Sequence, residues 1–302
     1  MTARFLTVAV NSLLAAGLYA EMAYGLAVIY GVMRIVNLAH AGFMMLGAYA
    51  TFTLYTRVGL DPFLAFFLVG PLFLALGMGL YRVVVRRVPS TGATPTVGSL
   101  LLLFGVWLVL QNLAYVIWSG DTQSILTSYT MKSVSILGVR VGVPSLLVFL
   151  ASTASLVFLN VLLRTTYLGK AIRAVTQNRD AAMLAGVDAE AISALAFGLG
   201  TAFAGVAGGM LSTLYAFTPD FGRSFLLKSF CIIVLGGMES VTGVAAGALV
   251  LAVLENALAV YTAVPTSLQD AISFGMLFVA LVVLPEGMSG LLGRTWRPGG
   301  AR

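Results

Sequence analysis

Charged residues, cysteine and histidine are all scarce in this sequence. Only 9% of its 302 residues are Asp, Glu, Lys or Arg, whereas an ordinary soluble domain has about 25%. The single Cys231 cannot form an intrachain disulfide, and together with the single His40 it supplies too few ligands for a Cys/His metal site. These absences exclude a soluble globular domain, a secreted disulfide scaffold and a nucleic-acid-binding protein.

Motifs for catalysis are missing as well. The sequence has no Gly-x-x-x-x-Gly-Lys-Ser/Thr phosphate loop, so the chain cannot hydrolyse ATP by that mechanism. It also lacks the paired acids, or the nucleophile with its base, that intramembrane catalysis requires. His40 stands in an apolar stretch of small residues, where hydrogen-bonded packing is a commoner role than ligand binding. We therefore expect no enzymatic activity and no cofactor or metal in this chain.

Apolar residues and glycine dominate the composition. The chain is 60% hydrophobic, has a mean hydropathy of +1.00 and contains 33 glycines, a combination typical of membrane helices. At about 20 apolar residues per crossing, the sequence predicts an all-α polytopic membrane protein with about 8–10 transmembrane helices. The first apolar run is too long for a cleavable signal and predicts an uncleaved span. The candidate spans are residues 6–30, 36–56, 62–81, 97–118, 143–163, 190–217, 226–260 and 267–285.

Basic residues gather in three groups, which the positive-inside rule assigns to the cytoplasmic face. Two candidate spans separate the first group from the second, so the Ser- and Thr-rich loop at residues 119–142 is expected on the outer face. The net charge of +6 therefore marks topology rather than an anionic partner. The groups are Arg82, Arg86 and Arg87; Arg164, Lys170, Arg173 and Arg179; and Arg294, Arg297 and Arg302.

The apolar segment at residues 226–260 is interrupted by a polar, Gly-rich stretch at 236–243. Arg179 and the C-terminal arginines are both expected on the cytoplasmic face, so an even number of crossings must separate them. Only three apolar segments lie between them, and the interruption lets this one enter and leave the membrane as two pieces. Broken helices are tolerated only where protein or water covers the freed backbone groups. The interruption is therefore a candidate functional element.

A weak internal repeat relates this interruption to one near the N-terminus. At an offset of 205 residues, residues 31–42 align with 236–247, and Gly, Met, Val, Ala and Gly coincide. Paired interrupted segments point to the pathway of a transporter, although chance similarity between two Gly-rich apolar segments explains the match equally well. The even number of crossings between the copies implies a parallel relation, whereas several transporter folds use inverted repeats. The candidate pathway residues are Asn37, His40, Gly42, Gly236, Gly237, Glu239 and Gly243.

Opposite charges occupy the same position of the two copies. Arg34 aligns with Glu239, and a lone charge at mid-bilayer costs at least about 3 kcal/mol. One hypothesis is an ion pair that joins the two interruptions. The alternative places each residue at a membrane surface, with Arg34 as a further inside anchor.

Three motifs, at residues 37–42, 169–187 and 234–243, closely resemble the LivH-type inner-membrane permease of branched-chain amino-acid ABC importers. The resemblance extends from about residue 10 to residue 292 and is specific to the family, not to the solute. The sequence departs from the family's usual pattern at the second interruption, with Glu239 in place of Gly and Thr242 in place of Pro, and at Ala41, where Gly is frequent.

The resemblance implies one transmembrane permease domain over residues 1–302 in a bacterial inner membrane. It also implies four kinds of partner: membrane lipid, a second homologous permease (LivM-like), two cytoplasmic ATPase subunits that carry ATP and Mg, and an external solute-binding protein. The implied cargo is a branched-chain or other apolar amino acid, moved by alternating access. Urea, short amides and other small solutes are handled by similar permeases, so the solute stays open.

The basic segment at residues 164–190 is predicted to dock a soluble partner. Its alanines favour a helix, and a short amphipathic helix can seat in a groove of a partner. In the resembled family this segment is the coupling loop that contacts the ATPase. The alternative is a helix on an anionic lipid surface. The residues assigned to the loop are Gly169, Arg173, Ala174, Asn178, Ala182 and Gly186, with the two glycines as caps or turns at its ends.

Acidic residues within the spans support a rival class. Glu21, Glu255 and Asp270 are possible proton or sodium sites of a secondary transporter. Glu255 and Asp270 are also explained as interfacial residues, whereas Glu21 lies inside the first apolar stretch. Two small-residue pairs, Gly205 with Gly209 and Gly243 with Gly247, are predicted to join helices rather than to line a pore.

Overall fold

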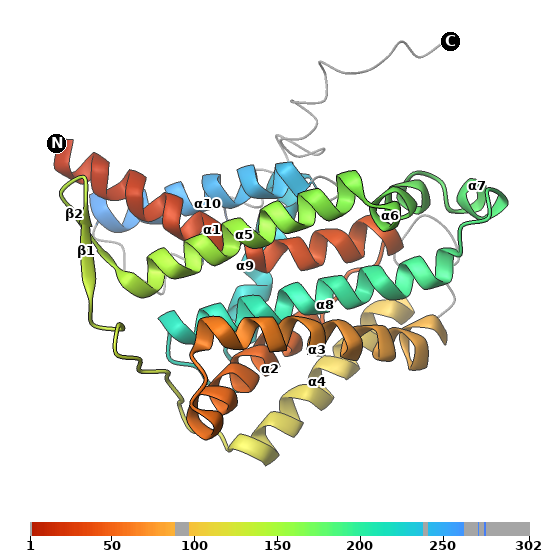
Figure 1. The fold of residues 1–302 in the computed structure, drawn as a ribbon, viewed down its shortest axis with the longest axis horizontal. Coiled ribbons are helices and arrows are strands. Elements are labelled where there is room, and N and C mark those ends of the chain that lie inside the picture. Colours follow the sequence, from red (N-terminus) through yellow and green to blue (C-terminus); the bar gives the residue numbers. More distant parts are fainter. Residues whose placement is uncertain (1, 88–96, 238–240, 263–270, 272–274, 276–302) are drawn as a thin grey trace, which may run out of the picture.

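Helices account for nearly all of the regular structure in the described chain, and this confirms the predicted all-α fold. The computed structural model describes residues 2–87, 97–237, 241–262, 271 and 275. The elements are α1 (Thr2–Met33), α2 (His40–Thr53), η1 (Leu54–Val58), α3 (Pro62–Val83), η2 (Val85–Arg87), α4 (Val97–Trp118), β1 (Ser133–Ile136), β2 (Val139–Gly142), α5 (Val143–Thr165), α6 (Tyr167–Gln177), α7 (Arg179–Leu184), α8 (Ala189–Leu214), α9 (Gly222–Gly236) and α10 (Val241–Tyr261) (Figure 1).

Six of the described helices are long and apolar enough to cross a membrane: α1, α3, α4, α5, α8 and α10. The predicted span at 36–56 is instead the 14-residue α2 followed by the π-helical turn η1. The predicted span at 226–260 is divided between α9 and α10, as its interruption indicates. The predicted span at 267–285 lies outside the described residues apart from two isolated positions.

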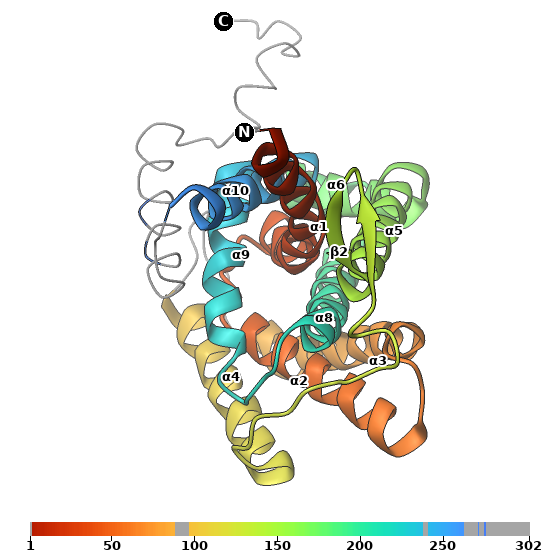
Figure 2. The same cartoon turned by 90° about the vertical axis from the view of Figure 1, so that its left-hand side faces the viewer.

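Helix α8 lies at the centre of the bundle, against α1, α2 and α3 (Figure 2). The most apolar windows of α1 and α8 are 78% buried, whereas those of α4 and α5 are 17% buried. The apolar outer faces of α4 and α5 are therefore left for lipid or for another subunit, because a water-exposed apolar surface of that size is unfavourable.

Glycine allows the helices around α8 to approach within backbone contact. A Cβ added at Gly208 would overlap the Met44 carbonyl of α2, and one added at Gly205 would lie 2.6 Å from the Phe73 ring of α3. A Cβ at Gly209 would lie 2.7 Å from the Phe66 ring. Since lipid supplies no hydrophobic drive between helices, such close contact is what stabilises the bundle. These contacts confirm the predicted helix-joining role of Gly205 and Gly209.

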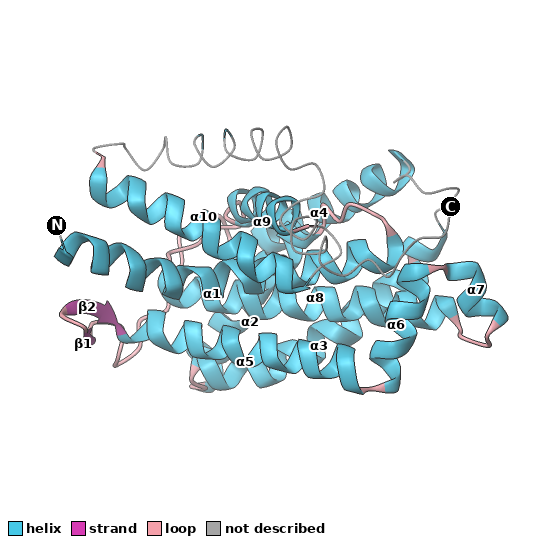
Figure 3. Cartoon of the chain, turned by 90° about the horizontal axis from the view of Figure 1, so that it is seen from above, coloured by secondary structure: helices cyan, strands magenta, loops and turns pink. Residues whose placement is uncertain are grey.

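The two ends of the bundle differ in charge. One end, here called the basic end, carries the end of α3, the end of α5, and α6 and α7, and includes the first two predicted basic groups (Figure 3). There Arg86 of η2 binds Glu190 at the start of α8, with Nε to Oε1 at 2.7 Å. The opposite end carries the β-hairpin and is called the hairpin end. By the positive-inside rule, we expect the basic end to lie in the cytoplasm and the hairpin end outside.

The hairpin is the strand element that the sequence interpretation did not foresee. Ser133 pairs with Gly142 and Ile136 with Val139 in antiparallel register. The turn residues Leu137 and Gly138 both have positive φ, at 52° and 81°, as a two-residue turn of type I′ requires. The hairpin leads directly into α5 and fixes the start of that helix at the hairpin end.

Hydrogen bonds also tie the rest of the outer loop to the helix ends. The Asp61 carboxylate accepts from Phe63 N at 2.9 Å, which caps α3, and from the Tyr129 hydroxyl at 2.8 Å. Burial and this hydrogen bond raise the pKa of Tyr129, so the donor keeps its proton. Gln123 and Phe217 exchange two backbone hydrogen bonds of 2.9 Å. The loop therefore lies against the helix ends rather than extending away from them.

Candidate functional site

The first interruption is a break of six residues between α1 and α2. Helix α1 ends at Met33, and Arg34 has a left-handed φ of 55°, which turns the chain out of the helix. Its backbone N–H still donates to the Tyr30 carbonyl at 2.8 Å. Helix α2 then begins at His40. The sequence interpretation placed the break correctly.

Asn37 and His40 are fully buried beside this break, at 0% exposure. The His40 Nε2–H donates to the Met22 carbonyl at 2.9 Å, so the imidazole ties the start of α2 to the middle of α1. This is the packing role that the sequence favoured for His40. The side-chain amide of Asn37 and Nδ1 of His40 have no hydrogen-bond partner among the described residues. Such groups are uncommon in protein interiors and are frequently functional.

The second interruption lies between α9 and α10. Gly236 ends α9, and Gly237 has a φ of 97°, which L side chains rarely adopt. A Cβ at Gly236 would overlap the Gly243 carbonyl, and one at Gly247 would lie 2.6 Å from the Ile232 carbonyl. Gly236 and Gly247 therefore let α9 and α10 pack closely together. Helix α9 crosses the bundle at a steep angle (Figures 1 and 2).

Some predicted pathway residues serve packing, and one cannot be placed. Gly42 faces α4, where an added Cβ would lie 3.1 Å from Leu110 and 3.4 Å from Trp107. Glu239 lies outside the described residues, so the Arg34–Glu239 ion pair stays a prediction. Both aligned stretches have the same form, a helix end, a short break and a helix start, but the repeat itself also stays a prediction.

A buried charged cluster joins α1, α9 and α10. Lys228 Nζ lies 3.1 Å from Glu255 Oε1, with side-chain exposures of 16% and 9%. The Tyr19 hydroxyl donates to Glu255 Oε2, and the Lys228 ammonium lies 5.6 Å from the centre of the Tyr19 ring. Glu255 therefore faces the interior of the protein rather than lipid or water. Sequence reasoning missed Lys228 and Tyr19, because neither lies near Glu255 in sequence.

Glu21 is the second buried acid of the spans. Its side chain is 1% exposed within α1, and neither carboxyl oxygen has a hydrogen-bond partner of acceptable geometry among the described residues. Its position inside the bundle agrees with the expectation that it is not interfacial. Asp270, the third acid of the rival interpretation, lies outside the described residues.

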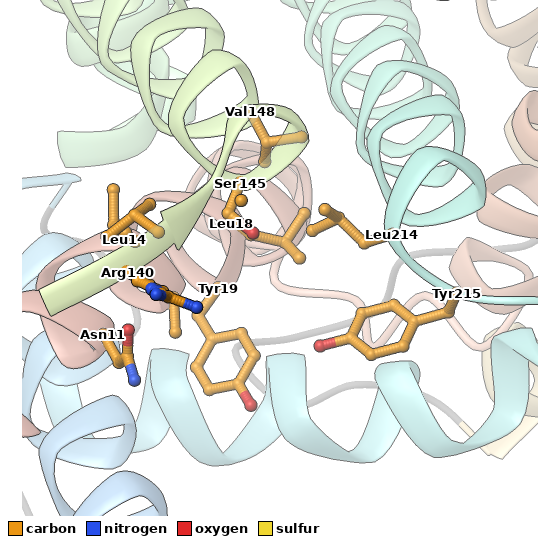
Figure 4. Close-up of a pocket in the computed structure, with 12 residues that line it drawn as sticks. Asn11, Leu14, Leu18, Tyr19, Arg140, Ser145, Val148, Leu214 and Tyr215 are labelled. Carbon is orange, nitrogen blue, oxygen red and sulfur yellow. The ribbon is translucent and has the colours of Figure 1, made fainter. Parts of the chain in front are cut away.

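A small pocket opens at the hairpin end, with a volume of about 170 Å³. Figure 4 shows the Tyr215 hydroxyl pointing toward Tyr19, Leu18 and Leu214 above the two rings, and Arg140 beside Asn11. None of the predicted pathway residues lines this pocket. Its residues come from α1, β2, α5 and the end of α8, which are far apart in the sequence.

The predicted coupling segment is two helices rather than one. Thr166 caps α6 by accepting from Gly169 N at 3.0 Å, and Asn178 caps α7 by accepting from Ala181 N at 2.9 Å. Gly186 ends the segment with a φ of 82°, as the sequence indicates. Gly169, in contrast, lies in the first turn of α6, where a Cβ would overlap the Leu162 carbonyl of α5.

These two helices form an exposed surface at the basic end. Arg173 is exposed while Ala182 is buried and Ala174 half-buried, so the helix pair has an inner and an outer face. Four large hydrophobic side chains of these helices are exposed, Tyr167, Leu168, Met183 and Leu184, and Leu184 at 91% and Tyr167 at 74% are the most exposed of them. This combination of basic and apolar groups is suited to a protein groove.

Taken together, the apolar crossing helices, the broken helix pairs and the surface at the basic end define a polytopic membrane transport protein. Residues 8–281 match the family described as the branched-chain amino acid transport system permease component. The chain belongs to this family.

Named relatives extend the likeness over nearly the whole chain. The high-affinity branched-chain amino acid transport system permease protein LivH of Escherichia coli (strain K12) is 27% identical over 95% of this chain and 96% of its own length. The corresponding BraD of Pseudomonas aeruginosa is 29% identical over 93% and 94%. The xylose transport system permease protein XylH of Haemophilus influenzae is 32% identical over 51% and 44%. No solved structure matches.

Proposed function

We propose that this chain is one of two permease subunits of an ATP-driven importer in a bacterial inner membrane. In this proposal a second homologous permease completes the pore, two cytoplasmic ATPases bind ATP and Mg, and an external solute-binding protein delivers the solute. The solute is a branched-chain or other apolar amino acid. The solute proposal rests on LivH and BraD, which are branched-chain amino acid permeases and match nearly the whole chain.

The observation that carries the proposal is the uncovered surface of α6 and α7 at the basic end. Several large hydrophobic side chains of these two helices are exposed, with Leu184 at 91% and Tyr167 at 74%, and exposed apolar side chains gathered at one surface are typical of an interaction site. Arg173 on the same surface matches an acidic rim of a partner. ATP binding on the partner would move these helices, and Gly169 joins them closely to α5, so that motion would reach the bundle.

Alternating access also needs elements that can rearrange within the membrane. The two breaks, at residues 34–39 and after Gly236, supply helix ends inside or near the bundle. The buried amide of Asn37, which has no hydrogen-bond partner among the described residues, supports a pathway beside the first break. Few side chains need to select the solute, because the binding protein performs most of that selection.

A second candidate is an importer of the same kind for another small solute. The likeness to the xylose permease over half of the chain favours this possibility. An ion-coupled transporter is less well supported, because Glu255 is neutralised by Lys228 at 3.1 Å. A buried carboxylate with a permanent counter-ion is a poor site for a transported cation.

Transport in proteoliposomes tests the proposal. The chain is co-reconstituted with its permease partner, the ATPases and the binding protein, and labelled leucine is added outside. We expect uptake that requires internal ATP and the binding protein and that vanadate inhibits. Uptake driven by a proton or sodium gradient without ATP would overturn the proposal. Uptake of xylose or urea, but not of leucine, would support the second candidate, and the solute retained by the binding protein would identify the cargo.

A further inference from the structure

A polar face lies where the outer half of α4 meets the start of α9. Ala114 on this half of α4 is buried against α2. The helical spacing puts Gln111 and Tyr115 on another side of α4, with the exposed Asn112 beside them. A third side is apolar and exposed, and consists of Val109, Leu113 and Val116. The outer half of α4 therefore shows a polar and an apolar surface outside its contact with α2.

Asp220 joins the polar side of α4 to the start of α9. It lies in the linker between α8 and α9, which turns beside α4 (Figure 2). Its carboxylate accepts from the Gln111 amide and from the Tyr115 hydroxyl, the latter at 2.5 Å. Arg223 and Ser224 follow in the first turn of α9, and both are exposed. The Arg223 guanidinium has no hydrogen bond or ion pair within the described part of the chain.

This polar face lies within the thickness of the membrane. Helix α4 has 22 residues and a length of about 33 Å, little more than the roughly 30 Å of the hydrocarbon layer. Gln111 stands about two turns, or about 10 Å, inside its outer end. A Cβ at Gly222, the first residue of α9, would overlap the Ala41 carbonyl of α2. The next residue of α2, Gly42, packs against Leu110 of α4, so α9 begins at the level of Gln111.

Charged side chains at this depth are costly in lipid, so they face the interior of a bundle or a water-filled cavity. Asp220 and Arg223 are exposed, and the interior of this chain therefore does not cover them. The two side chains carry opposite charges three positions apart but form no ion pair with each other, as is common where water solvates each charge. Water is therefore the surrounding that this face requires.

We propose that this face, here called the pathway wall and made of Asn112, Asp220, Arg223 and Ser224, borders the water-filled route of the solute. The second permease of the proposed importer supplies the opposite side. The inference rests on the proposed function for the existence of a route and adds where in this chain it runs. Asp220 and Arg223 leave the wall without net charge, so a zwitterionic amino acid is not repelled, and its carboxylate pairs with the free guanidinium of Arg223.

Cysteine labelling from water tests the pathway wall directly. Ser224→Cys and Asn112→Cys place a thiol on the wall, whereas Leu113→Cys places one on the apolar side of α4 at the same depth. Cys231 is fully buried and is kept, and the unsubstituted transporter gives the background. The complete transporter in proteoliposomes, with ATP and loaded binding protein present, is treated from outside with an anionic or a cationic methanethiosulfonate. These reagents need the thiolate, which forms in water rather than in lipid.

We expect both wall cysteines to be labelled and Leu113→Cys to react at the background rate. Labelling of Ser224→Cys blocks ATP-driven leucine uptake, and added leucine slows that labelling. Adding Arg223→Gln slows the anionic reagent at Ser224→Cys about 5-fold, the effect of a unit charge at about 4 Å in water, without slowing the cationic reagent. Lys132→Gln is the matched control, because it removes an exposed cation from the outer loop and leaves both rates unchanged.

The outcomes separate this inference from the proposed function. Wall cysteines that stay unlabelled, as when the second permease covers them, or that react no faster than Leu113→Cys would overturn the pathway wall. Labelling of Ser224→Cys that leaves leucine uptake unchanged would overturn it too, and an anionic rate unaffected by Arg223→Gln would overturn the role of Arg223. ATP-driven leucine uptake that persists in these cases would leave the proposed function intact. The expected labelling in vesicles that take up leucine only along an ion gradient would support the wall and contradict the proposed function.

Discussion

The buried Lys228–Glu255 pair allows a quantitative prediction about how the second broken segment is held. Lys228→Met leaves the Glu255 carboxylate buried with the Tyr19 hydroxyl but without its counter-ion. Removing one partner of a buried ion pair costs about 3–5 kcal/mol, whereas replacing both partners with apolar residues is often close to neutral. We therefore expect Lys228→Met to be strongly destabilising and the double variant Lys228→Met, Glu255→Met to recover most of the loss.

Thermal unfolding of the purified transporter in lipid nanodiscs measures this difference. At roughly 2–4 °C per kcal/mol, Lys228→Met lowers Tm by about 6–20 °C at the cost given above. Arg223→Gln is the control, because it removes an exposed cation from the same helix and changes stability by about 0.5 kcal/mol or less. Glu255→Met completes the cycle. If the losses of Lys228→Met and Glu255→Met simply add in the double variant, the two charges do not stabilise each other and the reasoning is wrong.

Further predictions concern packing, caps and the basic end. Gly208→Ala is expected to lower the free energy of unfolding by about 1–3 kcal/mol, because the new Cβ overlaps the α2 backbone. Gly105→Ala, where a Cβ has nothing within 4 Å, is expected to raise it by about 0.5–1 kcal/mol. The Tm of each variant measures the change. Asn178→Ala removes the α7 cap and costs about 1 kcal/mol, and faster amide exchange confined to α7 would reveal it. Leu184→Ser is expected to abolish co-purification of the ATPase without lowering Tm; retained co-purification would contradict a docking role. Glu21→Gln keeps the shape of a carboxyl group that has no hydrogen-bond partner among the described residues, so uptake stays within about 2-fold, and a complete loss would favour ion coupling.

Features that depend on local sequence were predictable. Apolar runs located the crossing helices, and the glycines at 236–237 located the end of α9, since Gly237 adopts a φ that other residues avoid. Gly186 was recognised as a helix stop for the same reason. The division of the coupling segment at Asn178 was missed, although Asn with an acidic residue in the following turn, here Asp180, is an ordinary helix-start signal.

Features that depend on long-range contact were not predictable from one sequence. Tyr19 and Glu255 are separated by 236 positions, and nothing in the periodicity of either helix indicates that they meet. The pocket likewise combines α1, β2 and the end of α8. Arg140 appeared only as a charge in an outer loop, because the hairpin that directs it toward α1 arises from a short turn of Leu137 and Gly138.

ATP hydrolysis by the reconstituted transporter tests the central claim most directly. Binding protein loaded with leucine is added on the outer side, and hydrolysis is measured at the opposite face. We expect a several-fold rise in hydrolysis that depends on the loaded binding protein and disappears in Leu184→Ser, because the signal has to cross the bundle and leave through α6 and α7. Hydrolysis that ignores the loaded binding protein, while leucine enters the vesicles along an ion gradient, would contradict it.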